Sequence, residues 1–128
     1  MNDMGIFRTT MSVENPLRPD VIEWLHEVLV DTGSELSWVP AEALERLGVA
    51  RRKRRERFQM ANGGELVRSI GYVILRAGDT ETNDEVVFGE REDLTLLGAR
   101  TLEGLNLRVD LTSRKLVAAG PILAAAGA

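Results

Sequence analysis

The chain has no cysteine and a single histidine among its 128 residues. Without cysteine there can be no disulfide, no cysteine nucleophile and no thiolate metal site. A lone histidine also argues against a histidine-rich zinc or iron centre. We therefore expect a protein that uses neither a metal ion nor another cofactor.

The chain also lacks long apolar runs and an excess of positive charge. No run approaches the roughly 20 apolar residues of a membrane-spanning helix, and residues 1–10 lack the basic start and apolar block of a signal peptide. The formal net charge of -4 gives no overall electrostatic support for nucleic-acid binding. These features predict a cytoplasmic protein that binds neither membranes nor nucleic acid.

What the sequence does have is alternation of apolar and polar residues, which is typical of half-buried β-strands. Residues 6–13 and 21–30 follow this pattern, with turn residues between them. Four apolar residues of the second segment are predicted to share one face: Ile22, Trp24, Val28 and Val30.

Later segments continue the β pattern, with two short helices. A helix is expected at Ala41–Leu47, between Pro40 as a start and Gly48 as a stop. Asn62-Gly63 predicts a hairpin turn, because both residues tolerate positive φ. The remaining predicted elements are strands at 86–88, 94–97, 105–111 and 115–117, the last closing the sheet, and helical turns at 98–103.

One acid stands where an apolar strand ends. Residues 28–30 run directly into Asp31, followed by Thr32, Gly33 and Ser34. A carboxylate at the end of a buried strand is costly to ionise, and proteins tolerate it mainly where the acid is used. On these residues alone, an Asx turn with a solvated carboxylate is an equally good interpretation.

Several motifs occur together and in a characteristic order. They are VLVDTGS at 28–34, a helix ending in LGV at 47–49, FQMANGGELVRSIGYVIL at 58–75 and TLLGARTLEGLNLRVD at 95–110. In this order the sequence resembles the retropepsin-like aspartic proteases, single-domain relatives of retroviral proteases and pepsin, over about residues 5–118. The opening segment, MGIFRTTMSVENP, is similar to bacterial and archaeal members.

The resemblance implies a mainly β, retropepsin-like acid protease fold. Such a fold has a closed, barrel-like sheet with a flap hairpin and one or two short helices. It would occupy residues 1–120 as one domain, with a flexible tail at 121–128.

The resemblance also implies an aspartic endopeptidase that acts on peptide or protein substrates. Only one Asp-Thr-Gly is present, so a homodimer would supply one Asp31 from each chain. Two adjacent carboxyl groups cannot both ionise easily, so they share one proton. The ionised member can then activate a water, while the protonated member donates a hydrogen bond to the carbonyl oxygen.

Further roles follow from the matching positions. Thr32 would brace the two active-site loops across the dimer axis, and Gly33 would offer backbone to the substrate. A hydroxyl at Ser34 can donate to the Asp31 carboxylate, which predicts an acid-leaning activity profile. The late glycine motif is Leu97-Gly98. Four residues form the expected flap tip over the substrate: Ala61, Asn62, Gly63 and Gly64.

Some residues have two interpretations. Glu35 and Arg100 are either a brace or two solvated charges, because the arginine is one place later than in retroviral enzymes. Trp38 is a core residue or part of a substrate subsite, and His26 is a packed or surface strand residue and not a ligand. The basic run at 51–57 is a solvated strand or loop, or a site for acidic partners.

Two other functions fit parts of the sequence. A retropepsin fold that binds a peptide or protein without cutting it is the main alternative. A nucleotide-binding fragment also uses an apolar strand ending in Asp-x-Gly, but such proteins need two domains and a longer chain.

Overall fold

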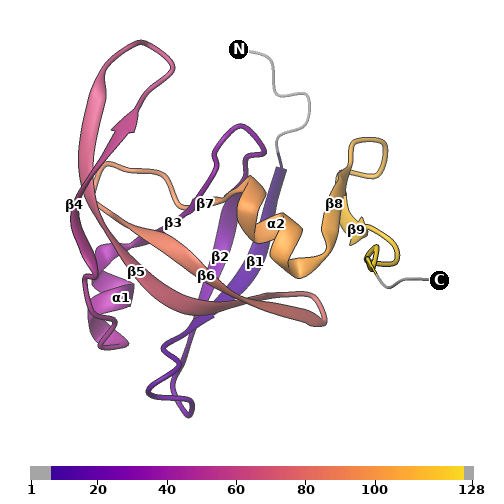
Figure 1. The fold of residues 1–128 in the computed structure, drawn as a ribbon, viewed down its shortest axis with the longest axis horizontal. Coiled ribbons are helices and arrows are strands. Elements are labelled where there is room, and N and C mark those ends of the chain that lie inside the picture. Colours follow the sequence, from indigo (N-terminus) through magenta and orange to yellow (C-terminus); the bar gives the residue numbers. More distant parts are fainter. Residues whose placement is uncertain (1–6, 126–128) are drawn as a thin grey trace.

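The computed structural model describes residues 7–125 and consists mainly of β-strands (Figure 1). The predicted strand start at residue 6 and the tail residues 126–128 lie outside this range. The strands are β1 (Phe7–Glu14), β2 (Ile22–Val30), β3 (Ser37–Pro40), β4 (Lys53–Gln59), β5 (Glu65–Ala77), β6 (Thr80–Gly89), β7 (Leu96–Leu97), β8 (Leu107–Asp110) and β9 (Lys115–Ala118). The helices are α1 (Ala41–Arg46) and α2 (Ala99–Leu105). Within the described range, neither helix has the length and apolarity to cross a membrane.

One large sheet organises the chain. Its strand order is β1-β2-β7-β3-β6-β5-β4, and an additional pairing of β1 with β5 joins the ends of a ring from which only β4 projects. This arrangement is consistent with the predicted barrel-like sheet, and the mainly β fold class is confirmed. The prediction that residues 115–117 close the sheet is wrong, because β9 pairs only with β8 in a separate two-stranded sheet.

The main hydrophobic core lies inside this ring and under the two helices. It takes alternate residues from the strands, such as Met11, Val13 and Val73, together with Leu44 of α1 and Leu105 of α2. A smaller second cluster contains Leu36, Ile70 and Val87, with Trp38 and Phe58 packed against it. Separation of the two clusters matters because the second one lies beneath the candidate site.

A β-bulge interrupts the pairing of β1 with β2. Thr9 pairs with Val28, but Met11 pairs with Leu25, so β2 has one more residue than β1 over this stretch. Glu27 within the bulge has a positive φ of 59°. An extra residue in one strand shifts every later side chain to the opposite face.

The bulge overturns the predicted common face of β2. Val28 and Val30 are buried, as expected, whereas Trp24 is 61% exposed and Ile22 is 43% exposed. Leu25 packs against the core in their place. The alternation read from the sequence was continuous, whereas the strand changes parity at the bulge.

The β4–β5 hairpin extends from the body of the molecule at the upper left of Figure 1. Its turn is closed by Met60 N–H donating to the Gly64 carbonyl at 2.8 Å, and Gly63 has a φ of 90°. The Asn62 side chain accepts a bond from Gly64 N–H at 2.9 Å. The predicted hairpin is therefore present, and residues 53–57 of the basic run form its exposed strand.

Candidate active site

Asp31 follows the last residue of β2, where the strand is held on both sides. β2 pairs with β1 on one edge and runs parallel to β7 on the other. Asp31 N–H donates to the Leu97 carbonyl at 3.0 Å, so the late Leu97-Gly98 motif fixes the backbone of Asp31. The acid and this motif are neighbours in the fold, although Leu97 comes 66 residues after Asp31 in the sequence.

The loop after Asp31 orients its carboxylate. Gly33 N–H donates to Asp31 Oδ1 at 2.9 Å, and Ser34 N–H donates to the Asp31 carbonyl at 3.1 Å. A Cβ on Gly33 would lie 3.2 Å from Oδ1, which explains the small residue. Among residues 7–125, no hydrogen bond to the other oxygen, Oδ2, is present. The half-buried carboxylate is thus fixed at one oxygen and open at the other.

The Ser34 hydroxyl has a different partner from the one expected. Its Oγ donates to the Leu36 carbonyl at 2.8 Å and stabilises the loop that leads into β3. Because the hydroxyl hydrogen is used there, the expected donation to the Asp31 carboxylate is absent. The acid-leaning activity profile, which rested on that donation, stays a prediction.

Gly98 allows the active-site loop to pack directly on the start of α2. A Cβ at this position would lie 2.5 Å from the Leu36 carbonyl oxygen and 2.8 Å from that of Ser34. Gly98 N–H donates to Ser37 Oγ at 2.9 Å, and this hydroxyl lies 2.6 Å from Thr101 Oγ1. The buried polar contacts behind the loop are therefore satisfied, as buried polar groups require.

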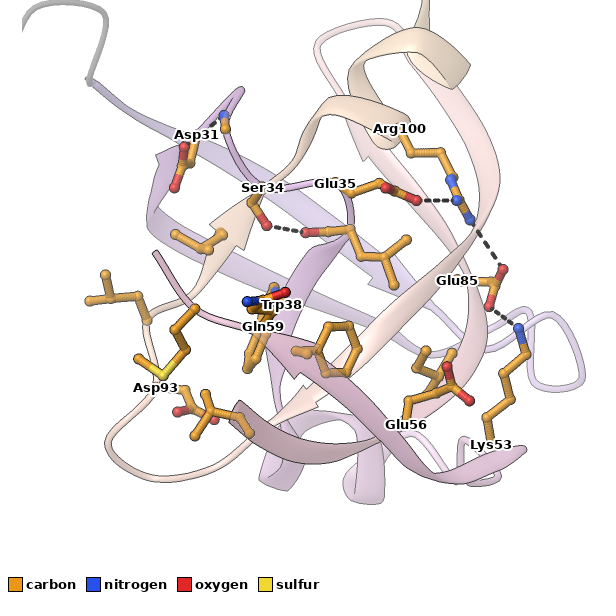
Figure 2. A pocket seen from close by; sticks show the side chains of 18 of the residues that line it. Asp31, Ser34, Glu35, Trp38, Lys53, Glu56, Gln59, Glu85, Asp93 and Arg100 are labelled. Carbon is orange, nitrogen blue, oxygen red and sulfur yellow. Dashed lines mark hydrogen bonds and ion pairs between the residues drawn. The ribbon is translucent and has the colours of Figure 1, made fainter. Parts of the chain in front are cut away.

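A cleft of about 780 Å³ opens beside Asp31 (Figure 2). Figure 2 shows Asp31 at one end, Trp38 near the middle, and Glu56 and Lys53 toward the other end. The apolar lining residues are Leu36, Trp38, Phe58, Met60, Leu66, Ile70, Leu94 and Leu96. The second hydrophobic cluster contributes to this lining, and the hairpin contributes residues from both of its strands.

An aromatic pair forms part of the cleft. The Trp38 and Phe58 ring centroids are 5.4 Å apart with an interplanar angle of 58°. Both side chains are half-buried. Trp38 therefore packs against the smaller core, as one of the two interpretations expected, and also lines the cleft; its part in a substrate subsite stays a prediction.

Charged residues along the cleft form a continuous series of ion pairs. Arg100 contacts Glu35 at 2.5 Å and Glu85 at 3.2 Å, and Glu85 contacts Lys53 at 2.8 Å. Arg100 N–H also donates to the Glu35 carbonyl at 3.0 Å. The start of α2 packs on the loop that carries Glu35. Arg100 therefore reaches Glu35 although it comes one place later than the arginine of retroviral enzymes, and the predicted brace is present.

A second ion pair fixes the loop after β6. Arg68 Nε lies 2.7 Å from Asp93 Oδ2, and Arg68 Nη2 lies 3.0 Å from Oδ1. This two-point bond to Arg68 lowers the pKa of Asp93 below its ordinary value, assisted by a bond from Glu90 N–H. The pair joins β5 of the hairpin to the segment that carries Leu94 into the cleft.

The predicted site residues divide into three groups. Asp31, Gly33 and Ser34 line the cleft, whereas Thr32 is exposed beside it. Leu97 and Gly98 lie behind Asp31 and position its loop. The flap-tip residues, which do not line the cleft in this structure, are Ala61, Asn62, Gly63 and Gly64.

Sequence reasoning missed Lys53, Glu56 and Glu85 as cleft residues. The run at 51–57 was treated as one basic block. Alternation along a hairpin strand could have separated its two faces, although a register shift between Lys53 and Glu56 obscures the pattern.

His26 is exposed, with Thr10 Oγ1 3.3 Å from its Nδ1. Over the described residues no group of three acidic, histidine or cysteine side chains is placed to hold a metal ion.

Comparison with known proteins identifies the class to which this arrangement belongs. Residues 25–105 match the family model described as aspartyl protease, which covers more than half of the chain and includes both Asp31 and Gly98. The chain therefore belongs to the aspartyl protease family, and the prediction of a retropepsin-like aspartic protease is confirmed at that level. Placement in a bacterial or archaeal branch stays a prediction.

Among solved structures, the chain is similar to a solution structure of the simian foamy virus (mac) protease. The two share 18% sequence identity with a TM-score of 0.47, over 74% of this chain and 92% of that one. No curated protein matches the chain.

Proposed function

We propose that this protein is an aspartic endopeptidase in which Asp31 activates a water for attack on a peptide bond. The observation that carries the proposal is the state of the Asp31 carboxylate. Oδ1 is held by Gly33 N–H at 2.9 Å, while Oδ2 is unbonded among residues 7–125, and both lie at the end of a large cleft. A fixed carboxylate with one free oxygen is suited to accept a proton from water.

The second carboxylate of the reaction comes, in this proposal, from Asp31 of a second chain in a symmetric homodimer. The sequence contains one Asp-Thr-Gly, and Asp31 and Thr32 are accessible at the same end of the molecule. Two neighbouring carboxyl groups share one proton. The ionised member then takes a proton from the water, and the protonated member donates to the carbonyl oxygen as negative charge develops there.

The substrate class that fits the cleft is an extended peptide with apolar side chains near the cut bond. Leu36, Ile70 and Leu96 line the cleft together with the Trp38–Phe58 pair. The hairpin carrying residues 61–64 is proposed to close over such a peptide and to exclude water. A cytoplasmic location, which fractionation of producing cells would test, completes the proposal.

The deciding test is cleavage of a diverse peptide pool by the wild type and by Asp31→Asn, read by mass spectrometry from pH 3.5 to 7. We expect cuts by the wild type and none by the variant, because the amide cannot accept the proton of water. Asp20→Asn is the matched control, since Asp20 is exposed in the β1–β2 turn. Cutting that survives in Asp31→Asn would refute the role of Asp31. A dimeric wild type that binds peptides without cutting them would favour the binding function.

A further inference from the structure

Most charges that line the cleft already have partners. Lys53, Glu85, Arg100 and Glu35 form the series of ion pairs described above. Asp93 is neutralised by Arg68. Pairing of this kind leaves little net attraction for a charged substrate along these residues.

Glu56 is one of the two cleft glutamates, with Glu92, whose side chains have no ion pair or hydrogen bond within the part of the chain that the structure describes. Lys53, the other charged cleft residue of the same strand, has its Nζ 2.8 Å from Glu85. Glu56 is also exposed, so its carboxylate is accessible from the cleft. On its cleft side the strand thus presents a carboxylate without an ion pair, whereas Arg54 and Arg55 of the same strand are not among the cleft-lining residues.

The surroundings of Glu56 suit one kind of side chain. Glu56 and Phe58 are two residues apart on β4, so they share a face at a spacing of roughly 7 Å. Phe58 packs with Trp38, and this aromatic pair gives a half-buried apolar surface next to the free carboxylate. Arginine and lysine place an apolar stem on such a surface while the charged head stays in water near an acid.

We propose that Glu56 is a specificity-determining residue that selects a basic side chain in the peptide, with the stem on Trp38 and Phe58. The inference rests on the proposed peptidase function and names its substrate class more closely: apolar residues near the cut bond and an arginine or lysine some residues away. Figure 2 shows Glu56 away from the Asp31 end of the cleft, which is why the basic residue lies at a distance from the cut bond. In a symmetric dimer, the preference appears on both sides of that bond.

Peptides that differ only by arginine, citrulline or glutamate at one position test the proposal. The variable residue is placed in turn at each of four positions on either side of the cut bond of one apolar cleavage sequence. For each peptide kcat/KM is measured. Citrulline keeps the shape of arginine without its charge. For the wild type we expect about a threefold preference for arginine over citrulline at the responsive position, decreasing as salt rises.

Three variants assign the preference to a residue. Glu56→Gln should reduce the ratio of arginine to citrulline to about one, and Glu56→Arg should favour the glutamate peptide. Glu42→Gln on α1 removes the same charge outside the cleft and should leave the threefold ratio unchanged. Cleavage of the citrulline peptide by each variant shows that it is folded.

The two proposals fail in different ways. A wild type that cuts the apolar sequence with no preference for arginine at any position overturns the role of Glu56 and leaves the peptidase function intact. Glu92 is another cleft acid whose side chain has no ion pair or hydrogen bond within residues 7–125. A preference that persists in Glu56→Gln and disappears in Glu92→Gln also overturns the role of Glu56. A wild type that cuts no peptide refutes the proposed function, and the inference falls with it.

Discussion

At the scale of single residues, Gly98 shows how one missing Cβ determines the geometry of the site. The carbonyl oxygens of Leu36 and Ser34 approach the position that a Cβ would occupy to 2.5 and 2.8 Å. These atoms belong to the backbone of the active-site loop, so they cannot move aside as a flexible side chain would. Any side chain at residue 98 must therefore displace the loop that follows Asp31.

We predict that Gly98→Ala lowers the free energy of unfolding by about 1–3 kcal/mol, the usual effect of overpacking. Urea unfolding at fixed protein concentration measures this change. Gly64→Ala is the matched control, because its φ is not positive and its nearest neighbour is the end of the Asn62 side chain at 3.2 Å. The control should stay within about 0.5 kcal/mol of the wild type. Equal losses in both variants would contradict the steric argument.

The sequence predicted which residues form the site better than it predicted the hydrogen bonds that those residues make. Asp31 and Gly33 were recognisable because VLVDTGS occurs in a characteristic order with the later motifs of the chain, since on their own these residues fit a solvated Asx turn equally well. The partner of Ser34 was not predictable, because the Leu36 carbonyl and the Asp31 carboxylate are both within a few residues of the hydroxyl. The choice between them depends on the path of the loop, which the packing of Gly98 fixes.

At the scale of elements, the Arg68–Asp93 pair links the hairpin to the loop after β6. Both side chains are largely buried, with exposed fractions of 12% and 10%. Because the pKa of Asp93 is lowered in the folded state, its ionised form stabilises the fold. This contribution is fully present above the ordinary aspartate pKa of 3.8 and is lost progressively as the pH falls from there through the lowered pKa of the folded state.

We predict that Asp93→Asn lowers the free energy of unfolding by about 1–3 kcal/mol at pH 7, because Arg68 loses a charged partner. Below pH 3.8 the difference from the wild type should decrease, because there the Asp93 carboxyl takes up a proton more readily in the unfolded chain than in the folded one. Urea unfolding at pH 7 and pH 3 tests both parts. A difference that is constant with pH would show that the carboxylate charge is not the cause, and Asp20→Asn controls for a change of surface charge.

Element boundaries were predictable where turn chemistry marks them and failed where the backbone is irregular. Pro40 and Gly48 bound α1 as expected, and Asn62-Gly63 forms the hairpin turn. The bulge near Glu27 has no glycine or proline to reveal it, so the faces of β2 were assigned wrongly before it. The pairing partners of β8 and β9 depend on contacts distant in sequence, which local periodicity does not contain.

At the scale of the whole molecule, the proposed function requires two chains for one reaction centre. We predict that mixing wild type with Asp31→Asn lowers activity in proportion to the square of the wild-type fraction, after subunits have exchanged. An equal mixture should retain about a quarter of the activity, because only dimers with two intact Asp31 residues can share the proton. The measurement is the rate of peptide cleavage at constant total protein, and a linear decrease to one half would indicate that each chain works alone.

The exposed edge of β4 has a consequence for the solution behaviour of the protein. A strand that lies at the end of a sheet offers unpaired backbone groups to any other extended chain. β4 carries Arg54 and Arg55, and Arg52 directly precedes it; none of the three has an ion pair among the described residues, and a register shift interrupts the pairing of β4 with β5. Two such edges carry charges of the same sign, which repel. We therefore expect these arginines to oppose edge-to-edge association of the protein at high concentration.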